Sequence, residues 1–204
     1  MIYEIKYQSK KLRNMKLQIR KGVFETNSSS THAISIRNNS VGNNYPEEVS
    51  FELGTFGWEY DHYNDTHTKA SYLWTAIVCL AKEGGNIEGD INYSVDDFVK
   101  YITETLSQYN IIAKFPHNYK TMKSYGGEEH MYNIFHDKDG NKPKYWIDHC
   151  DLSEFLNAMM SHQDLLMSYL FDDDSILITG NDNDDYDVED EITKNGNTIF
   201  YKGN

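Results

Sequence analysis

Apolar and polar residues alternate with a period of two in several short stretches of the chain, which is the pattern of a half-buried β-strand. In residues 15–21, for example, Met15, Leu17 and Ile19 share one face, and polar side chains lie between them. A strand is also predicted at 197–201, where Asn195-Gly196 indicates a hairpin with 191–194. The other predicted strands are 1–7, 33–37, 49–53, 111–115, 131–135, 144–147 and 175–179.

Three longer stretches carry apolar residues at the helical period of 3.6. The first covers 68–82, and a glycine pair follows it. The second begins after Ser94, whose spacing to Asp97 is that of a capping box. The third covers 151–171 and is expected to break near His162. Because these elements do not alternate as β-α-β units, the pattern predicts an α+β fold, with a largely antiparallel sheet and about three helices packed on it. We expect one domain over 15–204, with 1–14 as an N-terminal extension or edge strand.

The charge of this 204-residue chain is strongly acidic and unevenly spread. The formal net charge is −13, with seven Lys or Arg in residues 1–23 and ten Asp or Glu, without a base, in 172–191. Affinity for nucleic acid depends on Lys and Arg, so we expect no direct nucleic-acid binding. An acidic surface suits a partner protein with a basic surface, although acidity also keeps a small protein soluble.

The apolar runs and the cysteines exclude several other classes. No apolar run approaches the ~20 residues of a membrane-spanning helix, so no membrane association is expected, and we expect a cytoplasmic protein. Cys79 falls in an apolar helical pattern and is expected in the core, and Cys150 beside His149 provides too few ligands for a zinc site. The segment 137–141 superficially resembles a calcium loop, but a hairpin turn explains it better. We therefore expect no metal and no cofactor.

The stretch 22–32 is the densest polar loop in the sequence, with one carboxylate, one amide, five hydroxyls and one imidazole. Backbone N–H groups and hydroxyls can cradle a phosphate or a nucleotide, and His32 can act as a general acid or base. Alternatively, the hydroxyls satisfy the backbone of a structural or partner-contacting loop. If a nucleotide binds, Trp58 and Tyr60 can stack on its base. The candidate ligand-binding residues are Glu25, Thr26, Asn27, Ser28, Ser29, Ser30 and His32.

A second candidate is the acidic region that follows the third helical stretch. Its carboxylates can remain solvated, can bind Mg²⁺ or Ca²⁺, or can face the basic groove of a partner protein as a nucleic-acid backbone would. The candidate partner-binding residues are Asp172, Asp173, Asp174, Asp182, Asp184, Asp185 and Asp187.

The stretch 15–32, which ends in Val-Phe-Glu-Thr-Asn-Ser-Ser-Ser-Thr-His, resembles the opening of a family of small, mostly uncharacterised proteins of bacteriophages and prophages. The segments 56–59, 69–73, 178–182 and 201–204 are similar as well, so the resemblance covers most of the chain from Met15 onward. It implies a phage or mobile-element origin and an additional N-terminal piece before Met15. It carries no catalytic residue over to this chain.

These observations lead to two functional hypotheses of different classes. In the first, the chain is a phage-encoded accessory protein that binds and modulates a host protein complex, such as a nucleic-acid-handling defence complex, through its acidic surface in the cytoplasm of the infected bacterium. In the second, it is a nucleotide- or phosphoester-binding protein that uses the loop from Glu25 to His32. It would act either as a sponge, which sequesters its ligand, or as an enzyme. The sequence leaves open whether the chain is an enzyme.

Overall fold

The computed structural model describes residues 30–37, 44–57, 59–81, 91, 93–117, 119, 123–126, 132–135, 145–147, 152–181 and 198–203. Within these residues the strands are β1 Ser30–Arg37, β2 Glu48–Ser50, β3 Thr55–Phe56, β4 Asp61–Tyr63, β5 Ile112–Lys114, β6 Lys123–Gly126, β7 Tyr132–Phe135, β8 Tyr145–Ile147, β9 Ile176–Asn181 and β10 Thr198–Gly203. The helices are α2 Thr66–Leu80, α3 Val95–Ser107, α4 Ser153–Ser161 and α5 Gln163–Phe171. The predicted strands 1–7, 15–21 and 191–194 lie outside the described residues.

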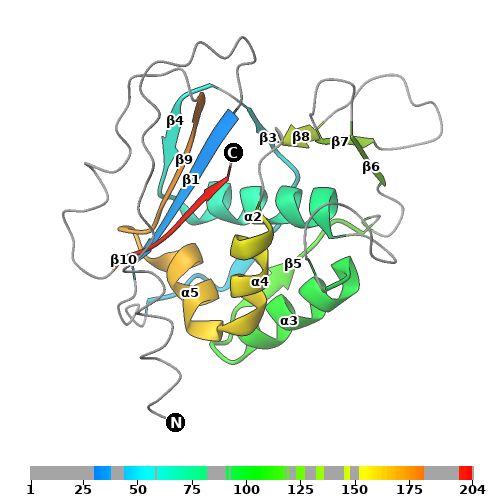
Figure 1. The fold of residues 1–204 in the computed structure, drawn as a ribbon. Coiled ribbons are helices and arrows are strands. Elements are labelled where there is room, and N and C mark those ends of the chain that lie inside the picture. The colour runs from blue at the N-terminus through cyan, green and yellow to red at the C-terminus, as the bar shows by residue number, and fades with distance from the viewer. Residues whose placement is uncertain are drawn as a thin grey trace, which may run out of the picture.

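The strands form three sheets, and most of the pairings are antiparallel. One four-stranded sheet has the order β10-β1-β9-β4, and a second four-stranded sheet has the order β3-β8-β7-β6 (Figure 1). Two pairs are parallel, β2 with β5 and β3 with β8. The predicted α+β fold is confirmed. The short strands β3, β4 and β6 and the two parallel pairs were not predicted.

Helix α2 is the centre of the fold. It contacts α3, α4 and α5 as well as β2, β6, β7 and β8, and it runs across the middle of the molecule in Figure 1. Every residue from Lys69 to Cys79 is buried, so the burial extends around the whole helix and is not limited to one stripe. The predicted apolar stripe is therefore correct, but the polar side chains Lys69 and Thr75 are buried with it. Asp65 is the N-cap of the helix, which begins at Thr66, two residues earlier than the pattern indicated.

The other predicted helices are confirmed, with small differences in their bounds. Ser94 and Asp97 form the expected capping box at the start of α3. His162 ends α4 and precedes α5, so the third helical stretch is divided where the sequence indicated. After Gly54, Phe56 is buried and meets Tyr72 edge-on, with ring centroids 5.0 Å apart, whereas Tyr60 is exposed.

Candidate functional site

The two segments that the sequence singled out are joined to neighbouring strand ends. Strand β1 pairs antiparallel with β9, and its first residue, Ser30, lies opposite Asn181, the last residue of β9. The polar loop enters β1 at Ser30, and the later part of the acidic region leaves β9 at Asn181. Both segments are thus connected to the same end of the β10-β1-β9-β4 sheet. The loop residues Glu25, Thr26, Asn27, Ser28 and Ser29, and the acidic residues Asp182, Asp184, Asp185 and Asp187, lie outside the described residues.

His32 belongs to the core of the protein. Its side chain is fully buried, its Nε2 lies 3.0 Å from the carbonyl oxygen of Gly57, and its Nδ1 lies 2.9 Å from the hydroxyl of Tyr72. A carbonyl oxygen only accepts, so Nε2 carries the proton, and in the neutral ring Nδ1 accepts from the tyrosine hydroxyl. The imidazole therefore connects β1 to α2 and to the segment before β4. In this geometry neither ring nitrogen faces a surface ligand, which weakens the hypothesis that His32 contacts an anion or acts as an acid or base.

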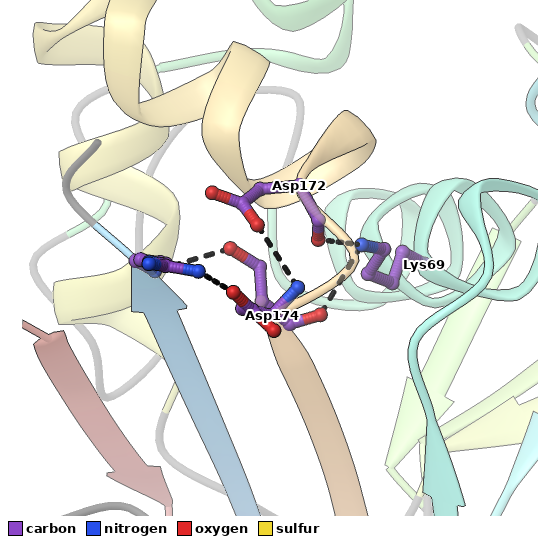
Figure 2. A network of polar contacts seen from close by, with 5 residues as sticks. Lys69, Asp172 and Asp174 are labelled. Carbon is purple, nitrogen blue, oxygen red and sulfur yellow. Dashed lines mark hydrogen bonds and ion pairs between the residues drawn. The ribbon is translucent and has the colours of Figure 1, made fainter. Parts of the chain in front are cut away.

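The acidic turn between α5 and β9 is partly committed to the fold, as Figure 2 shows. Asp172 accepts a hydrogen bond from the backbone N–H of Asp174 at 2.9 Å through Oδ1, and Asp174 forms an ion pair with Arg37. The backbone N–H of Arg37 donates to the Ser175 hydroxyl at 3.1 Å, so this turn is fixed to the end of β1. Burial raises the pKa of Asp172, against the opposing effect of the positive charges of Arg37 and Lys69. Of the three predicted partner-binding residues here, Asp173 alone has a carboxylate that is exposed and has no hydrogen bond or ion pair within the described residues.

Lys69 is a structurally important residue that the sequence analysis missed. Its side chain is fully buried, and Nζ donates to the backbone carbonyl oxygens of Asp172 at 2.9 Å and Ser175 at 3.2 Å (Figure 2). Burial lowers its pKa to about 8, although nearby carboxylates, Asp172 first, act to raise it. The signal in the sequence was a single lysine inside a helix that is otherwise apolar or small, but lysines of this kind usually extend to solvent.

The exposed surface of the described residues is strongly anionic. It carries thirteen exposed Asp or Glu and two exposed Lys, and each base lies near a carboxylate. Lys114 pairs with Glu48, and Lys100 lies close enough to Asp97 to lower the pKa of that carboxyl, behind the hydrogen bonds from Ser94. The exposed acids are Glu47, Glu48, Glu52, Glu59, Asp61, Asp65, Asp96, Asp97, Glu104, Glu154, Asp164, Asp173 and Asp174.

A pocket of about 540 Å³ lies between the segment that contains β2 and the first turn of α2. Its lining is mixed in polarity, and the residues are Asn44, Tyr45, Pro46, Glu48, Val49, Ser50, Thr66 and His67. The volume falls within the range of small-ligand sites. This pocket was not predicted, because the pairing of β2 with the distant β5 helps to place its wall.

Two kinds of feature are absent from the described residues. They contain no group of three or more His, Cys, Asp or Glu side chains placed to hold a metal ion. No described helix combines the length and the apolar character needed to cross a membrane. Cys79 is buried, as expected of a core residue, and forms no disulfide within the described residues. Comparison of the chain with protein-family models, with curated proteins and with solved structures gave no match.

Proposed function

We propose that this chain is an accessory protein of the bacteriophage type that binds a host protein complex through an acidic surface. The observation that carries the proposal is the excess of carboxylates over bases on the surface of the described residues, with the few bases near carboxylates or buried. A surface of this kind attracts a basic partner over several ångströms and repels nucleic acid. The resemblance of 15–32 to phage proteins supports a host protein as that partner.

The acids that can serve a partner are those that the fold does not use. Glu52, Asp164 and Asp173 are exposed, and the described residues provide none of them with an ion pair or a side-chain hydrogen bond. Asp172 and Asp174, by contrast, fix the turn after α5. Replacing the first three therefore alters the surface charge without altering the turn.

The test is affinity capture from bacterial lysate, with the immobilised protein at about 50 mM and about 500 mM salt. We expect a specific protein complex to be retained at low salt and lost at high salt. The variant Glu52→Gln/Asp164→Asn/Asp173→Asn, which loses three negative charges, is expected to retain much less of the complex than the wild-type protein. The control Lys100→Gln, which loses one positive surface charge, is expected to retain at least as much as the wild-type protein. Equal capture by the triple variant, or capture that does not depend on salt, would contradict the proposal.

A thermal-shift screen separates this proposal from nucleotide binding. A ligand at about 100 times its Kd stabilises a protein by about 2.7 kcal/mol, which raises the melting temperature by several degrees. We expect no such rise with nucleotides, cyclic nucleotides or inorganic phosphate. A rise that Ser29→Ala abolishes would favour the nucleotide-binding hypothesis instead.

A further inference from the structure

Strand β2 has one edge that no other strand of the described residues covers. Its partner β5 lies along the other edge, where the N–H of Ile112 donates to the carbonyl of Glu47 at 2.9 Å and the N–H of Phe51 donates to the carbonyl of Lys114 at 2.8 Å. In a parallel pair, alternate residues of a strand direct both backbone groups toward the partner. Glu47, Val49 and Phe51 therefore face β5. Glu48 and Ser50, between them, direct their N–H and C=O groups to the open edge.

The pocket of about 540 Å³ lies against this open edge. Glu48, Val49 and Ser50 form one wall, and Thr66 and His67 at the start of α2 contribute to the lining. An extended segment that pairs with β2 would place alternate side chains toward and away from this pocket. The edge thus offers backbone hydrogen bonds and a cavity for a side chain in the same place. In strand addition, the backbone hydrogen bonds provide affinity and such a cavity provides specificity.

Apolar side chains are exposed beside the same strand pair. Ile112, opposite Glu48 in the register, is 60% exposed, and Tyr109 is 37% exposed. The ring of Tyr109 packs edge-on against Tyr45, which lines the pocket, with centroids 5.3 Å apart. Exposed aromatic and aliphatic side chains next to a cavity are typical of the centre of a protein interface.

The surroundings of this edge are acidic. Glu47, Glu48 and Glu52 are exposed on the β2 segment, and Asp164 lies near enough to Tyr45 to contribute to the raised pKa of its hydroxyl, behind burial and Tyr109. The base on the strand pair is Lys114, which is paired with Glu48. Lysine or arginine side chains of a docked segment would meet carboxylates on this rim.

We propose that the open edge of β2 is the docking site for an extended, basic segment of a partner protein, which adds to β2 as a third strand and places an apolar side chain in the adjoining pocket. This inference rests on the proposed function, because it identifies where the basic partner binds. Tyr109, packed on Tyr45 at the pocket, forms the apolar part of the interface, and the carboxylates of Glu47, Glu52 and Asp164 select positive charge. The backbone groups of Glu48 and Ser50 supply the hydrogen bonds.

The probe for this inference is a fluorescein-labelled octapeptide of alternating lysine and valine, and its binding is followed by fluorescence anisotropy. Ser50→Pro removes the N–H that faces the open edge and places a ring there, and an edge strand tolerates proline at such a position. We expect Ser50→Pro to weaken binding about tenfold or more, because at least one backbone hydrogen bond is lost. The matched variant Ser50→Ala keeps the N–H and is expected to bind like the wild-type protein.

A second measurement removes the donors from the peptide and so does not depend on the folding of Ser50→Pro. Two peptides are N-methylated at alternate residues, one at the lysines and the other at the valines. Strand addition uses one set of amides, so one methylated peptide is expected to lose binding and the other to keep it. Hydrogen exchange at Glu48 and Ser50 is expected to slow when the unmodified peptide is bound.

Other outcomes separate the two proposals. Three results would overturn the β2 inference: undiminished binding to folded Ser50→Pro, equal binding of both methylated peptides, or no binding of the probe to the wild-type protein. The proposed function would still stand in each case, because a basic complex can be captured by another part of the surface. Probe binding that is lost in Ser50→Pro but is unchanged in Glu52→Gln/Asp164→Asn would support the edge and contradict the role of charge. Dimerisation of the wild-type protein that Ser50→Pro abolishes would assign the edge to a second copy of the chain and overturn the inference.

Discussion

The Nζ atom of Lys69 lies 2.9 Å from the backbone carbonyl oxygen of Asp172, more than one hundred residues later in the chain. The same ammonium donates to the carbonyl of Ser175, and the carbonyl of Lys69 accepts from the hydroxyl of Tyr169 at 2.9 Å. The first turns of α2 and the chain that leaves α5 are thus joined in both directions. Buried carbonyl groups without donors are costly, so this lysine contributes to stability although its charge is shielded from water.

Lys69 is expected to make the free energy of unfolding depend on pH in the alkaline range. Burial lowers its pKa in the folded state to about 8, whereas an unfolded lysine titrates near ~10.4. Between these values the unfolded chain binds more protons than the folded one, so this group makes the free energy of unfolding rise with pH. Relative to Lys69→Met, the wild-type protein is expected to gain about 1 kcal/mol between pH 7.5 and pH 9.

Urea denaturation of both proteins at several pH values measures this gain. The comparison with Lys69→Met cancels the contribution of the buried tyrosines to the pH dependence of unfolding. Burial raises the pKa of Tyr169 and of Tyr201 in both proteins alike. A difference in unfolding free energy that stays constant over this range would show that the folded lysine titrates like an exposed one.

His32 and Tyr72 are expected to be important for stability rather than for ligand contact. Replacing His32 by Ala opens a cavity and removes the hydrogen bonds that the imidazole makes with the Tyr72 hydroxyl and the Gly57 carbonyl, at a cost of about 3 kcal/mol. Tyr72→Phe removes the hydroxyl that hydrogen-bonds to Nδ1 of His32, so about 1–3 kcal/mol is expected. Denaturant unfolding of both single variants and the double variant is the measurement. Strictly additive costs would show that the two side chains do not interact.

Asp65 is expected to stabilise α2 as a hydrogen-bonding cap. Its Oδ1 accepts from the backbone N–H of Thr68 at 2.8 Å. Burial acts to raise the pKa of Asp65, but its hydrogen bonds, those with Thr68 first, bring the pKa below the usual value. Asp65→Ala is expected to lower the free energy of unfolding by about 1 kcal/mol. Asp65→Asn keeps a hydrogen-bond acceptor and is expected to lower it by only a few tenths of that amount.

The pH dependence of the Asp65 variants tests the contribution of its charge. A lowered pKa in the folded state stabilises the protein above the unfolded value near ~3.9, and this contribution is lost as the pH falls below it. The difference in unfolding free energy between the wild-type protein and Asp65→Asn is therefore expected to shrink below about pH 4. A difference that instead grows toward acid would contradict the lowered pKa.

Local patterns in the sequence predicted the elements that local physics determines. The Ser94–Asp97 capping box, the break at His162 and the strand at 33–37 each depend on neighbours within a few residues, and each appears as expected. The short strands β3 and β4 were missed because they are two and three residues long, and pairing with distant strands creates them.

The candidate site was harder to predict than the fold for the same physical reason. His32 has the composition of a functional residue, but Tyr72 and Gly57, 40 and 25 residues away, place it in the core. The open edge of β2 is likewise defined by its pairing with β5, more than sixty residues later. Tertiary contacts of this range have no periodic signal in a single sequence.

Gly57 is expected to require the absence of a side chain. A Cβ at this position would overlap the indole of Trp146, with Cζ3 only 2.7 Å away, and the carbonyl of the same residue accepts the hydrogen bond from His32. Either the indole or the backbone must move, so Gly57→Ala is expected to cost about 1–3 kcal/mol in the free energy of unfolding. Urea denaturation measures this cost.

The matched control is Gly180→Ala, because a Cβ at Gly180 would lie 3.7 Å from the nearest atom of Tyr60, an ordinary contact. That variant is expected to stay within about 0.5 kcal/mol of the wild-type protein. Trp146→Phe shortens the ring that Gly57→Ala would meet, so the double variant is expected to lose less stability than the sum of the two single variants. An additive result would mean that the cost of Gly57→Ala arises in the backbone, whose displacement would then weaken the hydrogen bond from His32 to the Gly57 carbonyl.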